Sequence, residues 1–462
     1  MFKQISYITS LQLLEKLLLF SVIPLIVNKL SVPDYGIYNL VITSGSLLFI
    51  LIHLYFHEYL NNFLTGLQIE KIKNFFFKFF ILTNISFIVI FSLSICLKFF
   101  VFNELNKYDL DFKILISILV LSYVDAAIKI LSSFFRVQMK IVLSNLLLNL
   151  FSISKILLIF FFVIYFKKIE NILLFSSLLF LTLYILFSLF VIIRYDFYKI
   201  NIHLFSVDYR KVFKFCFPLV ILAIFLWFNN FGDRFVFIYL VDFNFYSEFS
   251  LFYSIGTIGY FVPFILNLVY HPIIQKEQNI NQGKNIKIIF SNIYKYSLFF
   301  FILFIFFFNF LGDWIFSRLF PELYSKTFLQ NFYIITYGLF FYGLFESTYI
   351  LYFIRSKNFI LMKLSIIISM GYFLAICISY LLFKEVFAYS LFMIMKFLTL
   401  VASIYLNKKY FSFSDINFYQ FLILMVMFLI IILDLNNFFL LFLSFSYLII
   451  LINYRHNFFY SK

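Results

Sequence analysis

The chain carries little charge, which limits how it can meet water. Only 12% of its 462 residues are Asp, Glu, Lys or Arg, whereas 64% are hydrophobic. A soluble globular protein is about half apolar and about a quarter charged. A surface this poor in charge cannot be solvated on every side, so it must meet lipid. A soluble protein is therefore excluded.

Cysteines are also few. Cys96, Cys216 and Cys377 all lie inside apolar runs, which indicates neither a disulfide framework nor a metal site. The N-terminus lacks a charged segment followed by a small-residue cleavage site, and the first apolar run is too long for a signal peptide. We therefore expect this run to remain in the protein as its first helix.

Long loops and nucleotide-binding motifs are missing as well. No long polar segment separates the apolar runs, and the sequence contains no G-x-x-x-x-G-K-[ST] loop. These absences disfavour an ATP-driven pump and a membrane enzyme with a soluble catalytic lobe. We expect no enzymatic activity, no cofactor and no bound metal.

Long apolar runs are what the sequence does have. A membrane-spanning helix needs about 20 apolar residues. Runs of this length predict spans at 5–28, 37–61, 76–101, 113–135, 142–166, 171–193, 214–241, 248–271, 293–312, 329–354, 360–383, 385–406, 417–433 and 437–453. Very short turns separate the last spans, so twelve or thirteen are the alternatives to fourteen. The predicted fold is an all-α integral membrane protein.

The spans divide into two six-helix lobes and two further helices. The longest polar connection, at 194–213, separates residues 1–200 from 201–410, and residues 411–462 carry the last two spans. The short turns at 33–40 and 248–255, each leading into an aromatic-rich helix start, are a weak internal echo. Two related halves are typical of secondary transporters.

The cations set a predicted orientation. The net charge of +15 would suggest nucleic acid in a soluble protein, but here the cations lie mostly in short loops, where they determine topology. We expect no nucleic-acid partner. The richer set of loops carries Lys71, Lys73, Lys78, Arg136, Lys140, Arg194, Lys199, Arg210, Lys211, Lys214, Lys276, Lys284, Lys287, Arg355, Lys357, Lys363, Lys408, Lys409, Arg455 and Lys462. The alternate set carries Lys29, Lys107, Lys113, Lys167, Lys168, Arg318, Lys326 and Lys384. Both termini are therefore predicted to be cytoplasmic.

Ionisable side chains inside the spans are the candidate functional residues. Each costs about 2.5–3.5 kcal/mol at the bilayer centre, so each is expected to face protein or water. The cations among them are Lys16, Lys129, Lys155, Arg234 and Lys396, and the acids are Glu15, Asp125, Asp233 and Glu346.

Two interpretations of these charges remain open. In the first they only pair: Asp125 and Lys129 share a helical face, whereas Glu15–Lys16 and Asp233–Arg234 are adjacent and are expected to pair between helices. In the second, the five cations line a water-filled cavity for an anionic substrate such as a phosphate or pyrophosphate head group. The four acids would then couple ions or pair with the cations.

Two histidines form a weaker candidate. His53 and His57 are four residues apart, near Glu58, and this spacing suits metal binding or proton relay. No third ligand is evident, so a polar helix face is the favoured interpretation.

Two segments resemble the polysaccharide flippases of the Wzx type, in the multidrug/oligosaccharidyl-lipid/polysaccharide exporter superfamily. The first, Leu30–Leu40, is similar to that family's turn with a Gly-hydrophobic-Tyr step. The second runs from Phe217-Pro218 through Trp227 and Asp233-Arg234 to Ser250–Tyr253. Leu319–Tyr324 and Arg355–Lys357 are weaker echoes, and Ser250 departs from the Gly that the family commonly carries.

The resemblance implies a flippase of the bacterial inner membrane. Such a protein moves an undecaprenyl-pyrophosphate-linked oligosaccharide to the periplasmic leaflet by alternating access, with a proton or sodium as coupling ion, for O-antigen or capsule assembly. Of the candidate cations, only Arg234 is carried by a family-like motif. A drug or metabolite exporter and a lipid II flippase of the same superfamily are the alternatives, as is a membrane enzyme such as a polymerase, which the short loops disfavour.

Overall fold

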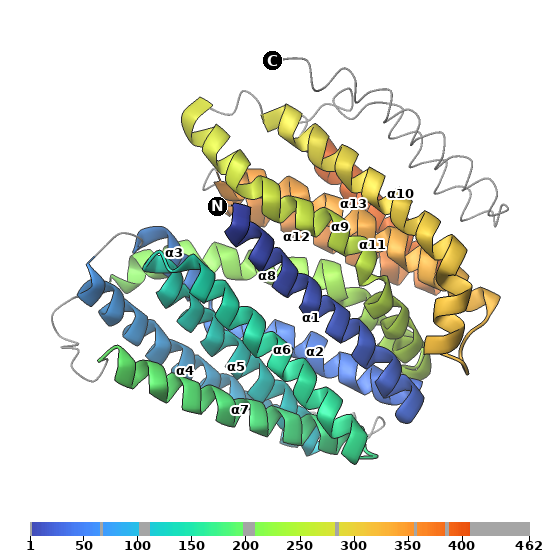
Figure 1. Ribbon diagram of the computed structural model, residues 1–462, viewed down its shortest axis with the longest axis horizontal. Helices are drawn as coiled ribbons and strands as arrows, with labels where there is room; N and C mark the ends of the chain where they lie inside the picture. The colour runs from blue at the N-terminus through green and yellow to red at the C-terminus, as the bar shows by residue number, and fades with distance from the viewer. Residues whose placement is uncertain are drawn as a thin grey trace. The chain divides into compact units, whose positions relative to one another are not determined.

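The computed structural model describes residues 2–64, 68–100, 111–196, 208–281, 286–354, 358–383 and 388–406. These residues form helices and no strand (Figure 1). The helices are α1 (Phe2–Lys29), α2 (Val32–His53), α3 (Phe56–Phe63), α4 (Ile69–Phe100), α5 (Phe112–Val137), α6 (Ile141–Tyr165), α7 (Ile169–Arg194), α8 (Tyr209–Leu240), α9 (Phe243–Asn281), α10 (Ile286–Leu319), α11 (Lys326–Ile354), α12 (Asn358–Phe383) and α13 (Ala388–Leu406). The all-helical prediction is confirmed.

The predicted spans match the helices well. Length and composition allow eight of the described helices to cross a membrane, or nine if the two arms of α10, Asn292–Phe308 and Phe310–Leu319, form one bent span. The predicted spans at 417–433 and 437–453 lie outside the described residues. The chain is a multi-pass membrane protein.

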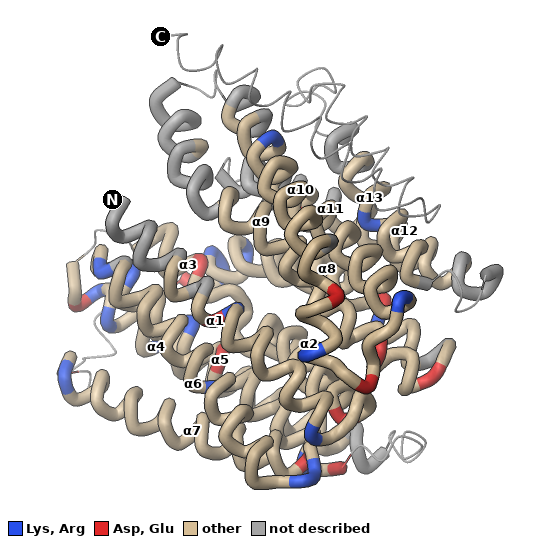
Figure 2. Tube along the Cα trace, turned by 45° about the vertical axis from the view of Figure 1, so that its right-hand side comes forward, with Lys and Arg blue, Asp and Glu red and all other residues tan. Residues whose placement is uncertain are grey.

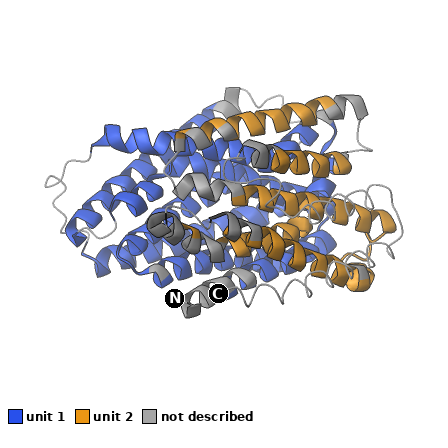
Figure 3. Cartoon of the chain, turned by 90° about the horizontal axis from the view of Figure 1, so that it is seen from above, with its two compact units in different colours: residues 1–251 blue, residues 252–462 orange. Residues whose placement is uncertain are grey.

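The chain divides into two compact units, residues 1–251 and 252–462 (Figure 3). The division falls inside α9, whereas the predicted lobes meet before α8. The lobe boundaries therefore remain a prediction.

Helix α5 is the centre of the first unit. It packs against α2, α3, α4, α6 and α7. Of its apolar 18-residue stretch, 67% is buried, whereas the corresponding share in α4 is 11%. Helix α4 exposes Ile81, Ile85 and Ile88, whose spacing of three or four residues makes one apolar stripe. Such a stripe suits contact with lipid, and charged positions lie mainly near helix ends (Figure 2).

Helix α11 has the central position in the second unit. It packs against α10, α12 and α13, and 72% of its apolar 18-residue stretch is buried. Aromatic rings fill this packing: Phe301 of α10 stacks on Phe340 of α11 with ring centroids 3.9 Å apart. Gly338 leaves room on α11 for the ring of Phe392 on α13.

The start of α2 explains the turn that the sequence analysis singled out. Ser31 is the N-cap, and its hydroxyl accepts from the Asp34 backbone N–H at 3.2 Å. Gly36 then lies directly against α9, because a Cβ there would be 2.0 Å from Ser247 Oγ and 2.7 Å from Ser247 Cβ. Only glycine permits this approach of the two helices.

We expect Gly36→Ala to destabilise the protein by about 1–3 kcal/mol, because the added methyl group would overpack the contact with Ser247. The matched control is Gly371→Ala, since nothing lies within 4 Å of a Cβ at Gly371. That control should be neutral or slightly stabilising, because alanine favours helix. Thermal unfolding in detergent measures both variants. Equal melting temperatures for the two would contradict the close packing.

The second predicted span, 37–61, is wrong as one continuous helix. Helix α2 ends at His53 and α3 begins at Phe56, with Leu54 at φ 46° and Tyr55 at φ 58° between them. The left-handed region costs an L-residue other than glycine about 1–2 kcal/mol. Two such residues in succession therefore need tertiary packing to hold them.

Candidate functional site

A cavity of about 370 Å³ opens within the first unit, between α2, α5 and α6. It contains three of the ionisable residues singled out in the sequence and three serines. Its lining residues are Val41, Ile42, Gly45, Ser46, Phe49, Leu121, Ser122, Asp125, Ile128, Lys129, Leu148, Phe151, Ser152 and Lys155. A polar, charged cavity of this size inside a membrane protein is a natural binding site.

The acid in the cavity pairs across helices. Lys155 Nζ of α6 lies 2.8 Å from Asp125 Oδ2 of α5, and the two side chains are 19% and 37% exposed. The local Asp125–Lys129 pair, which the sequence analysis left open, is not observed among the described residues, because Lys155 holds the carboxylate. Lys155, which has no acid on its own helix, finds one on its neighbour.

Lys129 is the second cation that lines the cavity. Within the part of the chain that the structure describes, no hydrogen bond or ion pair reaches its ammonium group. The charge of Glu58 attracts this ammonium group and the charge of Arg136 repels it. The cavity wall thus carries two cations and one carboxylate.

The serines are held mostly by their own helices. The hydroxyl of Ser122 donates to the Ile118 carbonyl, and that of Ser46 donates to the Thr43 carbonyl at 2.6 Å. Hydroxyls bonded in this way add polarity to a helix face while their donor group stays satisfied. Their oxygen lone pairs remain available to donors.

Trp227 of α8 braces the α2 wall of the cavity. Its indole Nε1–H donates to Ser46 Oγ at 2.9 Å and to the Thr43 carbonyl at 3.0 Å. Trp227 also belongs to a buried cluster with Ile50 of α2. The tryptophan of the family-like segment therefore has a positioning role.

Arg234 does not line this cavity. It is 2% exposed, its NH1 donates to Asn39 Oδ1 of α2 at 2.6 Å, and its guanidinium lies 4.9 Å from the Phe231 ring. Asp233 Oδ1 accepts from the Arg234 backbone N–H at 2.8 Å. The hydrogen bond from the Arg234 guanidinium to the Asn39 side-chain amide therefore ties α8 to α2.

The first candidate pair lies apart from the cavity lining. Lys16 Nζ is 3.9 Å from Glu15 Oε1, and the Lys16 side chain is 47% exposed. Among the described residues, the two side chains therefore contact each other and not a charge on another helix. A contact this long and exposed contributes little free energy.

The remaining two candidates meet in the second unit. Tyr260 of α9 donates to Glu346 Oε2 of α11 at 2.5 Å, and Lys396 of α13 acts electrostatically on the same carboxyl. Lys396 is fully buried. Its Nζ lies over the rings of Tyr372, Tyr342 and Phe392 at 4.1, 4.8 and 5.3 Å. Lys396 is thus enclosed by aromatic faces.

His53 and His57 do not share one helix face, so the interpretation of the two histidines as a polar helix face is wrong. The break at Leu54 and Tyr55 lies between them, and the imidazoles stack with centroids 4.8 Å apart and an interplanar angle of 22°. Both are buried. Among the described residues, no three His, Cys, Asp or Glu side chains come together as a metal site.

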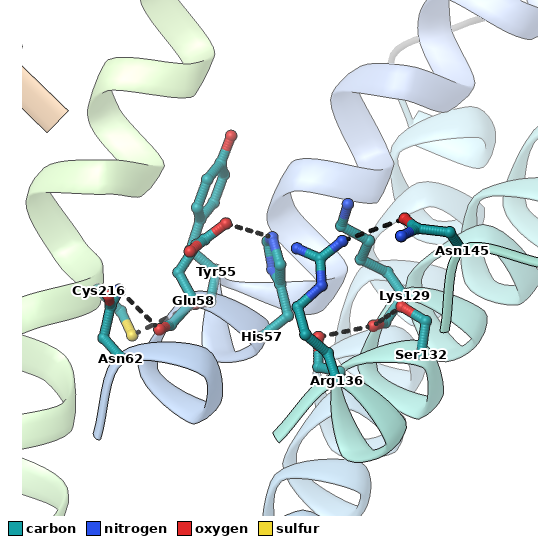
Figure 4. A network of polar contacts seen from close by, with 10 residues as sticks. Tyr55, His57, Glu58, Asn62, Lys129, Ser132, Arg136, Asn145 and Cys216 are labelled. Carbon is teal, nitrogen blue, oxygen red and sulfur yellow. Dashed lines mark hydrogen bonds and ion pairs between the residues drawn. The ribbon is translucent and has the colours of Figure 1, made fainter. Parts of the chain in front are cut away.

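Helix α3 lies beyond the α2 span, and His57 lies there near Glu58 of α3 and near Lys129 and Arg136 of α5 (Figure 4). His57 Nε2 is 3.3 Å from Glu58 Oε1. Burial lowers the pKa of the His57 imidazole. Burial by itself would raise the pKa of Glu58, but the hydrogen bond from His57 and the charges of Lys129 and Arg136 bring that pKa below its usual value. A neutral imidazole therefore donates to an ionised carboxylate.

Several polar partners escaped the sequence analysis. Tyr342 stands four residues before Glu346 on α11, a helical spacing that could have revealed it. Asn39, Tyr260 and Tyr372 meet their charged partners from other helices. No local signal separates them from the many other polar and aromatic residues of the chain.

No family model and no curated protein sequence matches the chain. Solved structures with the same fold include "Lipid II flippase MurJ, inward closed conformation", at 17% identity and a TM-score of 0.59, covering 97% of this chain and 99% of that one. A multidrug resistance MATE family transporter of the MOP superfamily, in an inward-facing conformation, is 13% identical with a TM-score of 0.61. The match covers 85% of this chain and 94% of that one. The MATE multidrug transporter DinF-BH is 13% identical with a TM-score of 0.62, and the match covers 88% of this chain and 95% of that one. These neighbours are transporters and flippases, and they share the fold over nearly their whole length.

Proposed function

We propose that this protein, with the fold shared by MATE transporters and MurJ, is a flippase for an anionic lipid-linked oligosaccharide. The cargo is an undecaprenyl-pyrophosphate-linked repeat unit, moved from the cytoplasmic to the periplasmic leaflet of a bacterial inner membrane for O-antigen or capsule assembly. The distribution of Lys and Arg over the loops supports a topology with both termini in the cytoplasm.

The cavity of the first unit carries this proposal. Its wall holds Lys129 and Lys155 against a single carboxylate, Asp125. Phosphate oxygens bind ammonium groups strongly, and the excess of positive charge disfavours a cationic drug. A volume of about 370 Å³ suits a diphosphate with part of a sugar.

The remaining charged candidates fit a supporting role in this cycle. Arg234 on α8 and Lys396 on α13 are further buried cations, whereas Lys16 on α1 is exposed and already contacts Glu15. Glu15, Asp125, Asp233 and Glu346 are the acids through which a proton or sodium gradient would drive alternating access. Lipid is a further partner, along apolar faces such as the stripe of Ile81, Ile85 and Ile88 on α4.

A gene deletion in the host tests the proposal. Loss of surface polysaccharide, with lipid-linked repeat units trapped on the cytoplasmic side of the membrane, is the expected result. Restoring the gene should clear them. Normal polysaccharide with altered resistance to small cationic compounds would replace the proposal with an exporter. Accumulation of peptidoglycan precursors instead would point to a lipid II flippase.

A further inference from the structure

The two stacked imidazoles each leave one nitrogen unused. His53 Nδ1 lies 2.6 Å from the Phe49 carbonyl oxygen, and His57 Nε2 lies 3.3 Å from Glu58 Oε1. Both oxygens only accept, so these nitrogens carry the ring protons. His53 Nε2 and His57 Nδ1 therefore present lone pairs, and both atoms are buried with no hydrogen-bond partner among the described residues.

A buried lone pair without a donor is costly. A proton on either nitrogen would add a buried charge and an N–H that finds no acceptor among the described residues, so the bent arrangement disfavours protonation. The described residues also offer no third metal ligand. The pair is thus two vacant proton acceptors held face to face, 4.8 Å apart.

The surroundings make a proton on this pair consequential. Glu58 of α3 is the one carboxylate acting on the pair among the described residues, while Lys129 and Arg136 of α5 are cations. Helix α8 contributes Cys216, whose thiol donates to the Tyr55 carbonyl at 3.7 Å. Helix α4 presents the ring of Phe79 to α3. One proton can be balanced by Glu58, whereas a second would be repelled by the first and by Lys129 and Arg136.

The pair also holds the strained bend between α2 and α3. The Tyr55 ring lies 4.9 Å from the His53 ring and 5.3 Å from the His57 ring, so three rings gather over the two left-handed residues. Leu54 and Tyr55 would relax on returning to helical geometry. The stacked neutral imidazoles are a contact that opposes this relaxation.

We propose that the His53–His57 pair is a proton-binding site whose occupancy controls the bend between α2 and α3. Protonation of one ring places a cation in the stack beside Lys129 and Arg136, which weakens the contact holding the bend. The His53 ring stacks on Phe49 at 4.1 Å, and Phe49 lines the cavity. A change at the bend on proton binding is therefore expected to move Phe49 in the cavity wall, whatever cargo the cavity holds.

Hydrogen exchange of the full chain in lipid nanodiscs tests the proposal. Acidification from pH 8 to pH 5 should raise the exchange rate of amides 52–60 at least fivefold after correction for the intrinsic pH dependence. His57→Gln should remove that response. His271→Gln, on α9, is the matched control and should retain it. An equal response in native protein and His57→Gln, or no response in either, would overturn the proposal.

Nuclear magnetic resonance of ring nitrogens in native protein gives a second reading that does not depend on a variant folding. The chain has five histidines. Two of them should titrate in separated steps, because the first proton on the pair opposes the second. Five single steps near the ordinary value of about 6.5 would overturn a coupled pair.

Discussion

Replacement of Lys129 by Gln is expected to slow transport of an anionic lipid-linked oligosaccharide roughly 10–100-fold. The Lys129 ammonium lines the cavity and has no ion-pair partner among the described residues, so it is available to a phosphate. A hydrogen bond to a charged group contributes about 1.5–3 kcal/mol, and about 1.4 kcal/mol corresponds to a factor of ten. Flipping of a fluorescent lipid-pyrophosphate oligosaccharide in proteoliposomes measures the rate.

Two further variants make this result specific. Lys129→Arg keeps the charge and should retain most of the transport. Lys16→Gln removes an exposed cation that already contacts Glu15, and should change the rate less than twofold. The sequence placed both lysines in one set of candidates, and the structure separates them. Equal losses for Lys129→Gln and Lys16→Gln would contradict the assignment of the cavity to the cargo.

Replacement of Lys396 by Ala is expected to destabilise the protein by about 2–5 kcal/mol, because it opens a void in a fully buried site. The variant also loses the contacts of the ammonium with the rings of Tyr342, Tyr372 and Phe392, each of which strengthens when water is excluded. The readout is the melting temperature in detergent.

Lys363 of α12 provides the matched control. Its Nζ lies 4.8 Å from the ring of Phe359, but its side chain is exposed. Lys363→Ala should therefore shift the melting temperature little. Adding Glu346→Gln to Lys396→Ala should recover part of the loss, since the buried carboxyl would no longer lack its cation. Additive losses in the double variant would show that the two groups do not interact.

Composition and the spacing of apolar runs were enough to predict the fold. Helices α4 to α13 begin and end within a few residues of the predicted spans, apart from the longer ends of α4, α8, α9 and α10. Long apolar segments must satisfy their backbone groups internally in lipid, and that constraint leaves the helix as the one local solution. The bend after His53 was not predictable, because neither Leu54 nor Tyr55 is a residue that marks a turn.

The site was predictable in its members but not in its partnerships. Asp125 and Lys129 stand four apart and invited a local pair, yet Lys155, 30 residues away, holds the carboxylate. Contacts between helices depend on which faces meet, and a single apolar sequence does not fix that. The enclosure of Lys396 was hidden for a different reason: with 77 Phe and 34 Tyr, aromatic neighbours carry no signal.

The hydrogen bond from Trp227 to Ser46 has a spectroscopic consequence. The chain has two tryptophans; Trp227 is 5% exposed and Trp314 is 56% exposed. Replacing Trp314 by Phe leaves a single indole, bonded to a residue of the cavity wall. Its emission wavelength and lifetime depend on that bond, so occupancy of the cavity can be followed by intrinsic fluorescence without attaching a dye.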